Sequence, residues 1–181
     1  MSSLVNNIER VLITENEIKL RVKELAKQIT FDYQNKELLL VGILKGSLVF
    51  MSDLMRELDT NAKIDFMSVS SYGNATNSSG QVRIIMDLKS PIENFDVLIV
   101  EDILDSGATL SYLKQLLLAR KPRSIKICTL LDKPDRRKAD IVADYVGMVI
   151  PDEFVVGYGL DFSEDYRNLP YIGILKPSAY M

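Results

Sequence analysis

Length, composition and charge limit what this chain can be. Its 181 residues are 47% hydrophobic and 26% charged, which is typical of one globular domain with a substantial core. The formal net charge of −3 argues against nucleic-acid binding as the main activity. The sequence contains no histidine, which excludes histidine-based catalytic triads and histidine-ligated zinc.

The single cysteine and the hydropathy pattern predict a compartment. Cys128 lies in an apolar run and has no second cysteine with which to pair, so we interpret it as a packing residue in a reducing environment. The sequence shows no signal-like segment and no apolar segment of membrane length. We therefore expect a cytoplasmic protein that has neither a membrane nor a nucleic acid as its partner.

The first predicted element is a scaffold helix. Thr14 and Glu17 match a capping box, in which the two side chains satisfy orphan backbone N–H groups at a helix start. After them, apolar residues recur on one helical face, namely Ile18, Val22, Leu25, Ala26 and Ile29. We assign no chemistry to this helix, and residues 1–36 otherwise carry little recognisable signal.

The next segment has the order strand, small-residue turn, helix. Leu38–Leu44 is a continuous apolar run, which predicts a strand buried on both faces. Lys45-Gly46-Ser47 follows, and then a helix that can bury Leu48, Met51, Leu54, Met55 and Leu58. Backbone amides and one ammonium group suit an anion such as pyrophosphate. Taken alone this signal is weak, and an ordinary loop lysine explains it as well.

Two strands with a long polar connection come next. Lys63–Val69 and Val82–Met86 are predicted to form strands that pair with each other. Residues 70–80 between them contain no Leu, Ile or Val. They are too many for a tight hairpin, whose loops have about 2–5 residues. The segment is either a slack surface loop or a lid over a site, and composition alone does not decide between them.

The stretch from Asp96 to Leu110 carries the strongest signal. The run 97–100 predicts a strand buried on both faces, and the acids Glu101 and Asp102 follow it where it would leave the sheet. The small residues 105–109 then precede a helix with leucines at helical spacing. Such a turn binds anions through free backbone N–H groups and the helix dipole. Because carboxylates repel phosphate, the acidic pair should face hydroxyl groups or a metal ion; the alternative is an ordinary turn with a solvated acidic pair.

The last third contains two further candidate segments. Ser124–Leu131 is predicted to be a strand, and the alternating charges of residues 132–137 are typical of a solvated loop. Asp144–Ile150 predicts another strand, after which Pro151–Phe162 interleaves aromatic residues and valines with glycines. An exposed aromatic ring beside backbone polar groups suits a flat heterocycle, although a core strand with a glycine-rich turn is the alternative.

These motifs carry a resemblance to a known family. The segment VEDILDSGATL resembles the ribose-phosphate signature of the type I phosphoribosyltransferases. That resemblance implies that Glu101 and Asp102 bind the ribose hydroxyl groups. It also implies that the 5-phosphate is bound by Asp105, Ser106, Gly107, Ala108 and Thr109. Asp105 is our candidate general base for the N7 proton of the purine, and it can also cap the following helix.

Further segments extend the resemblance. The segment LKGS resembles the pyrophosphate loop of purine phosphoribosyltransferases, which implies pyrophosphate contacts from Lys45 and Gly46 and a peptide before Lys45 that is often cis. In the same enzymes a lid carries a Ser-Tyr dipeptide, which Ser71 and Tyr72 match. A lysine at the place of Lys133 donates a hydrogen bond to the 6-oxo group, which favours 6-oxopurines over adenine.

The segment IPDEFVVGYGLDFSEDYRNLPYIGIL is very similar to the C-terminal signature of hypoxanthine-guanine phosphoribosyltransferases. By this resemblance Phe154 stacks on the purine and the Val155 backbone reads the edge of the base. Asp161 reaches a magnesium ion, to which we add Glu101 and Asp102 as metal candidates, and Arg167 contacts pyrophosphate.

The resemblance covers most of residues 38–175 and implies a fold and an activity. We expect an α/β protein of the type I phosphoribosyltransferase fold, with a mostly parallel twisted sheet flanked by helices and a small hood formed by the terminal segments. One domain would span residues 1–181, with a core of about 37–150 and a hood from the N-terminal segment and about 151–181. We expect Mg²⁺ as cofactor, 5-phosphoribosyl 1-diphosphate and 6-oxopurines as substrates, and a homodimer or homotetramer.

Two alternatives remain open at this stage. Variation within residues 132–137 leaves the base preference open, so the chain could encode an enzyme of the same fold that prefers xanthine or a pyrimidine. A regulator that keeps the ribose-phosphate pocket but binds nucleic acid is the other alternative. A broad basic surface would mark such a regulator, and this acidic composition does not indicate one.

Overall fold

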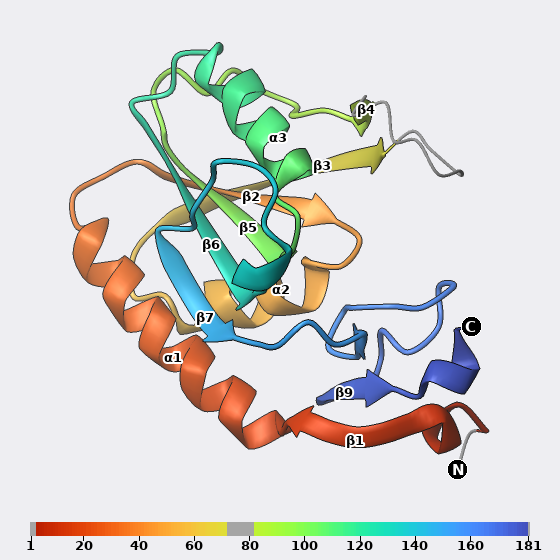
Figure 1. The fold of residues 1–181 in the computed structure, drawn as a ribbon. Helices are drawn as coiled ribbons and strands as arrows, with labels where there is room; N and C mark the ends of the chain where they lie inside the picture. The colour runs from red at the N-terminus through yellow and green to blue at the C-terminus, as the bar shows by residue number, and fades with distance from the viewer. Residues whose placement is uncertain (1–2, 72–81, 181) are drawn as a thin grey trace.

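A mostly parallel six-stranded sheet forms the body of the molecule (Figure 1). The structure is a computed structural model that describes residues 3–71 and 82–180. In spatial order the strands of this sheet are β4 (Val82–Met86), β3 (Ala62–Ser71), β2 (Leu38–Leu44), β5 (Asp96–Leu104), β6 (Ser124–Asp132) and β7 (Tyr145–Val149). All neighbouring strands are parallel except β3 and β4. The predicted α/β class is confirmed.

Helices cover both faces of this sheet. Figure 1 shows α1 (Glu15–Asp32) and α2 (Leu48–Glu57) on one face and α3 (Ala108–Leu118) on the other. The capping box predicted for the start of α1 is present, with the backbone N–H of Thr14 donating to Glu17 Oε2 at 2.8 Å. The apolar face of α1 is buried as its periodicity predicts.

Strand β2 shows how one run of residues serves two cores. Its side chains alternate, so that Leu38 and Leu40 pack in the core beneath α1 and α2, whereas Leu39 and Val41 pack in the core beneath α3. A strand between two helical layers needs apolar side chains on both faces, which explains the unbroken run Leu38–Leu44. Cys128 is buried in the first of these cores, as expected for a packing residue.

The two ends of the chain form the hood, a small antiparallel sheet in the order β1 (Ile8–Ile13), β9 (Ile172–Leu175) and β8 (Val155–Val156). In Figure 1 both termini lie beside this sheet. The sequence did not indicate β1, because only Ile13 of its six residues is fully buried and its partner lies at the other end of the chain. Short 3₁₀ turns complete the chain: η1 (Ser3–Asn7), η2 (Pro134–Arg136) and η3 (Pro177–Ala179).

Strand β5 is longer than its apolar run predicts. The expected strand ended at residue 100, but the parallel ladder with β6 continues through Glu101, which pairs with Thr129, to Leu104, which pairs with Asp132. The acidic pair therefore lies within the strand, and the interpretation that it follows the strand is wrong. Main-chain pairing with β6 extends the strand where side-chain hydrophobicity stops. No helix in the described residues has both the length and the apolar character needed to cross a membrane.

Candidate active site

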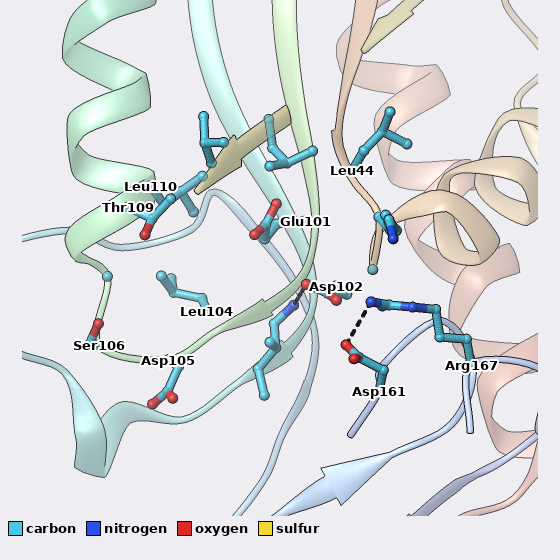
Figure 2. A pocket seen from close by; sticks show the side chains of 16 residues that line it. Leu44, Glu101, Asp102, Leu104, Asp105, Ser106, Thr109, Leu110, Asp161 and Arg167 are labelled. Carbon is cyan, nitrogen blue, oxygen red and sulfur yellow. Dashed lines mark hydrogen bonds and ion pairs between the residues drawn. The ribbon is translucent and has the colours of Figure 1, made fainter. Parts of the chain in front are cut away.

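A cavity of about 300 Å³ lies at the carboxyl ends of β2 and β5, between the sheet and the hood (Figure 2). The carboxyl ends of parallel strands are the usual ligand site of an open α/β sheet. Ten of the residues singled out in the sequence line this cavity: Lys45, Gly46, Glu101, Asp102, Asp105, Ser106, Gly107, Thr109, Asp161 and Arg167. The candidates for the ribose, phosphate and pyrophosphate groups are therefore brought together.

Both carboxyl groups of the acidic pair, Glu101 and Asp102, have raised pKa values. Burial raises the pKa of Glu101 well above its ordinary value, and the neighbouring Asp102 raises it further. Glu101 Oε2 is buried without a hydrogen-bond partner. Burial likewise raises the pKa of Asp102 to about 6, although its Oδ1 accepts a hydrogen bond from the backbone N–H of Ile103 at 2.8 Å. Two carboxylates held this way gain stability from hydroxyl donors or from a cation.

The perturbed pKa of Asp102 gives a prediction for the free protein. An aspartate in an unfolded chain has a pKa near 4, so between about pH 6 and pH 4 the folded protein binds a proton that the unfolded chain does not. This group therefore destabilises the fold at neutral pH and ceases to do so as the pH falls. We expect Asp102→Asn to raise the melting temperature at pH 7.5 by about 5 °C, from about 2 kcal/mol.

Thermal unfolding at two pH values checks this prediction. At pH 5 the rise in melting temperature caused by Asp102→Asn should be smaller, because the wild-type carboxyl group is then largely protonated. Asp87→Asn is the control of opposite sign, since a hydrogen bond from Arg120 lowers the pKa of Asp87. A melting temperature that Asp102→Asn lowers at pH 7.5 would contradict the prediction.

The turn before α3 is built to expose backbone N–H groups. Gly107 is the N-cap residue of α3, it has a left-handed φ of 81°, and no side chain caps the helix. A Cβ at Gly107 would lie 2.6 Å from Ile141 Cγ2, so the position requires glycine on steric grounds too. The first N–H groups of α3 are thus available to an anion. The interpretation of Asp105 as helix cap is wrong, because Gly107 occupies that position. Ala108, the first residue of α3, has an exposed side chain outside the cavity lining.

Asp105, two residues before Gly107, also lines the cavity (Figure 2). Its Oδ1 lies 3.2 Å from Arg136 Nε, an ion pair without hydrogen-bond geometry. Arg136 also pairs with Asp152, whose Oδ1 lies 3.4 Å from Nη1. The candidate base is therefore linked by one cation to the segment that leads into Phe154.

The Lys45 loop packs directly against the acidic pair. The Leu44–Lys45 peptide is cis, as the resemblance implies. A Cβ at Gly46 would lie 1.6 Å from Asp102 Oδ2, so only glycine fits at this contact. From the hood, Gly159 meets the same loop, because a Cβ there would lie 2.2 Å from the carbonyl oxygen of Gly46. The Lys45 loop thus contacts strand β5 through the Asp102 side chain and the hood through the backbone of Gly159.

The two candidate pyrophosphate cations are paired with hood carboxylates. Lys45 Nζ lies 2.8 Å from Glu164 Oε2. Arg167 Nη2 lies 2.8 Å from Asp161 Oδ1 and 3.6 Å from Glu164 Oε2, and its Nη1 donates to the carbonyl of Gly159 at 2.8 Å. A diphosphate would replace these carboxylates as the partner of both cations. Sequence reasoning did not single out Glu164, because its ion pairs with Lys45 and Arg167 depend on the fold.

None of the three purine candidates lines the cavity. Lys133 is buried, and its Nζ donates to the carbonyl of Glu153 at 2.6 Å. Phe154 is 38% exposed, with one face stacked on Tyr180 at a centroid distance of 4.7 Å. Val155 is buried in β8 and pairs with Ile174. The predicted loop or lid, residues 70–80, begins too early, because Ser70 and Ser71 are still part of β3 and pair with Arg83 and Val82. Tyr72 lies outside the described residues.

Arg137 is the site residue that the sequence interpretation missed. The charged run 132–137 was interpreted as a solvated loop, but the Arg137 side chain is only 16% exposed and pairs with Asp132. Its donors reach the main chain of the turn before α3. In the sequence, the signal for Arg137 was its position four residues after Lys133.

The fold and the cavity define an α/β protein with a ligand site at the carboxyl ends of its parallel strands, and comparison with known proteins gives its family. The phosphoribosyl transferase domain family matches residues 11–163. The chain belongs to this family.

Within it, the chain is 60% identical over 175 residues to the hypoxanthine-guanine phosphoribosyltransferase of Bacillus subtilis, covering 97% of each chain. It is 62% identical over 175 residues to the enzyme of that name from Staphylococcus aureus, covering 97% of this chain and 98% of the relative. A crystal structure of a hypoxanthine phosphoribosyltransferase from Staphylococcus aureus superposes with a TM-score of 0.96 at 60% identity, covering 99% of this chain and 98% of the other.

The donor set of the cavity fits a hard divalent cation that also binds substrate. Glu101 has a buried carboxylate oxygen without a partner, and Asp102 lies beside it. Asp161 is already paired with Arg167. Among the described residues no three acidic or cysteine side chains converge as a complete metal site. Mg²⁺ commonly uses one or two carboxylates together with substrate phosphates and water, and these residues fit that pattern.

Proposed function

We propose that this protein transfers the 5-phosphoribosyl group of 5-phosphoribosyl 1-diphosphate to N9 of hypoxanthine or guanine. The products would be IMP or GMP and pyrophosphate, in purine salvage. One observation carries the proposal: a turn with free N–H groups, an acidic pair and two cations line a single cavity. The names of the relatives at 60% and 62% identity support the same reaction.

Each part of the cavity has a role in this proposal. The residues from Ser106 to Thr109 would bind the 5-phosphate through backbone N–H and hydroxyl groups. Glu101 and Asp102 would accept hydrogen bonds from the ribose hydroxyls and stabilise positive charge on the ribose ring as the bond to pyrophosphate breaks. Lys45 and Arg167 would bind the leaving pyrophosphate. Asp105 would accept the N7 proton of the purine.

Mg²⁺ is the proposed cofactor, held by Glu101 and Asp102 with Asp161 nearby. When bound, it would supply charge neutralisation to the diphosphate, which is otherwise a poor leaving group. Asp161 would change partner for this role, because its carboxylate pairs with Arg167 in the structure.

The purine would bind beside the cavity, between Asp105 and the segment before β8. Phe154 would stack on the base, the Val155 backbone would read its edge, and the Lys133 ammonium would donate to the 6-oxo group. The hydrogen bond from Lys133 to the Glu153 carbonyl would then be exchanged for one to the base. The link from Asp105 through Arg136 to Asp152 supports this position.

The remaining expectations belong to the same proposal. Ser71 and Tyr72 would form part of a lid that excludes water from the sugar carbon. The chain would act as a single domain of residues 1–181, in the cytoplasm, as a homodimer or homotetramer.

A magnesium-dependent assay of purine loss with 5-phosphoribosyl 1-diphosphate tests the function. Hypoxanthine, guanine, xanthine, adenine and uracil are compared side by side, with and without Mg²⁺. We expect turnover of hypoxanthine or guanine and none of adenine or uracil. Preference for xanthine would replace the substrate assignment, and weak catalysis with tight, salt-dependent RNA or DNA binding would replace the function itself.

A further inference from the structure

Three consecutive carbonyl groups at the start of the turn before α3, those of Leu104, Asp105 and Ser106, are held by the neighbouring segment 133–139. The carbonyl of Leu104 accepts from Lys133 N at 3.0 Å and from Arg137 Nη2 at 3.2 Å, and that of Asp105 accepts from Arg137 Nε at 3.0 Å. The carbonyl of Ser106 accepts from the backbone N–H groups of Lys138 and Ala139 at 2.9 and 3.1 Å. Three consecutive carbonyls thus point away from the cavity.

Arg137 is the one side chain in this set of contacts. Besides the two turn carbonyls it donates to the carbonyl of Ile141 at 2.8 Å and pairs with Asp132. Its Cδ lies against the face of Gly107, where a Cβ would be 3.0 Å away. Arg137 therefore touches both ends of the turn and is itself fixed from the other side. A planar guanidinium with donors in several directions suits this task, and an ammonium does not.

The direction of these carbonyls matters for anion binding. A turn binds phosphate only if its N–H groups face the ligand, so its carbonyl oxygens, which repel phosphate, must face elsewhere. Carbonyls turned into the protein need donors, because a buried carbonyl without a partner is costly. We propose that Arg137 is a positioning residue for the 5-phosphate, which acts by holding the Leu104 and Asp105 carbonyls away from the ligand. This inference rests on the proposed function of the same cavity.

Arg137→Ala tests the inference, with Lys138→Ala as matched control. Both variants lose one cation from the same segment, but Lys138 is exposed and Lys138→Ala keeps its backbone donor to Ser106. We expect Arg137→Ala to raise the KM for 5-phosphoribosyl 1-diphosphate at least about tenfold, with the KM for hypoxanthine changed by less than about twofold. Added guanidinium chloride should restore part of the loss, and Arg137→Lys should fall between Ala and wild type.

Equal changes in both KM values, no recovery with guanidinium, or the same defect in Lys138→Ala would each overturn the inference. If Arg137→Ala does not fold, Arg137→Lys is titrated with ribose 5-phosphate by calorimetry, where an unchanged Kd would overturn it. Ribose 5-phosphate binding needs no turnover. A wild-type protein that binds it without catalysing transfer would therefore reject the proposed reaction and still leave Arg137 under test.

Discussion

Asp105→Asn is expected to lower kcat by about 10²- to 10⁴-fold, the usual contribution of a general base. Asparagine has the same shape but cannot accept the proton that leaves the purine. The fold should survive, because the Asp105 side chain caps no helix and its one ion pair, with Arg136, is partly exposed. Steady-state kinetics with saturating hypoxanthine and 5-phosphoribosyl 1-diphosphate measure the loss, and the melting temperature reports the fold.

Two controls make this result specific to the carboxylate. Asp135→Asn makes the same chemical change at an exposed position of η2 and should leave kcat unchanged. Arg136→Gln removes the partner of Asp105 and shows how much of any loss comes from the ion pair alone. Turnover of Asp105→Asn equal to that of wild type would remove Asp105 from the mechanism.

Gly46→Ala is expected to raise the KM for 5-phosphoribosyl 1-diphosphate at least about tenfold and to destabilise the protein by about 1–3 kcal/mol, the cost of overpacking. The added Cβ would lie 1.6 Å from Asp102 Oδ2 and 2.6 Å from its Cγ. The carboxylate must then leave its place beside Glu101 or the Lys45 loop must move. Either shift disrupts the contact between the Lys45 loop and strand β5. Kinetics and thermal unfolding of the single variant measure both effects.

A double-mutant cycle separates this clash from other consequences of the substitution. In an Asp102→Ala background the obstructing carboxylate is absent, so Gly46→Ala should cost much less stability than in the wild-type background. Equal costs in the two backgrounds would show that the contact with Asp102 is not the reason glycine is required. Gly42→Ala is unsuitable as a control, since a Cβ there would meet Met51 Sδ at 2.3 Å.

Local patterns predicted much of the central sheet. Leu38–Leu44 and Val82–Met86 match their strands residue for residue, because apolar runs and flanking turns are local signals. The capping box at Thr14 likewise needs only its own neighbours to form. The end of β5 was misplaced because it depends on backbone pairing with β6, which leaves no mark in the side chains of residues 101–104.

The residues for the sugar and its phosphates could be predicted better from the sequence than the residues for the purine. Apart from Ala108, the residues expected to bind ribose, phosphate and pyrophosphate line one cavity, since most of them lie at the carboxyl ends of the neighbouring strands β2 and β5. Lys133 and Phe154 were singled out mainly through the resemblance, and both have protein partners in the present arrangement. Arg137 escaped notice because its contacts are with main-chain carbonyls, which any sequence would offer.

The pairing of β1 with β9 affects the order in which the chain folds during synthesis. Ile8 pairs with Leu175, and β9 is the middle strand of its sheet, so β1 stays without a partner until β9 has been synthesised. The six strands of the main sheet end at Val149 and can be complete earlier. Contacts between distant residues form slowly because long loops must close first. On the ribosome, the main sheet would therefore form before the hood, and a chain released before β9 would keep the six-stranded sheet while β1 had no strand to pair with.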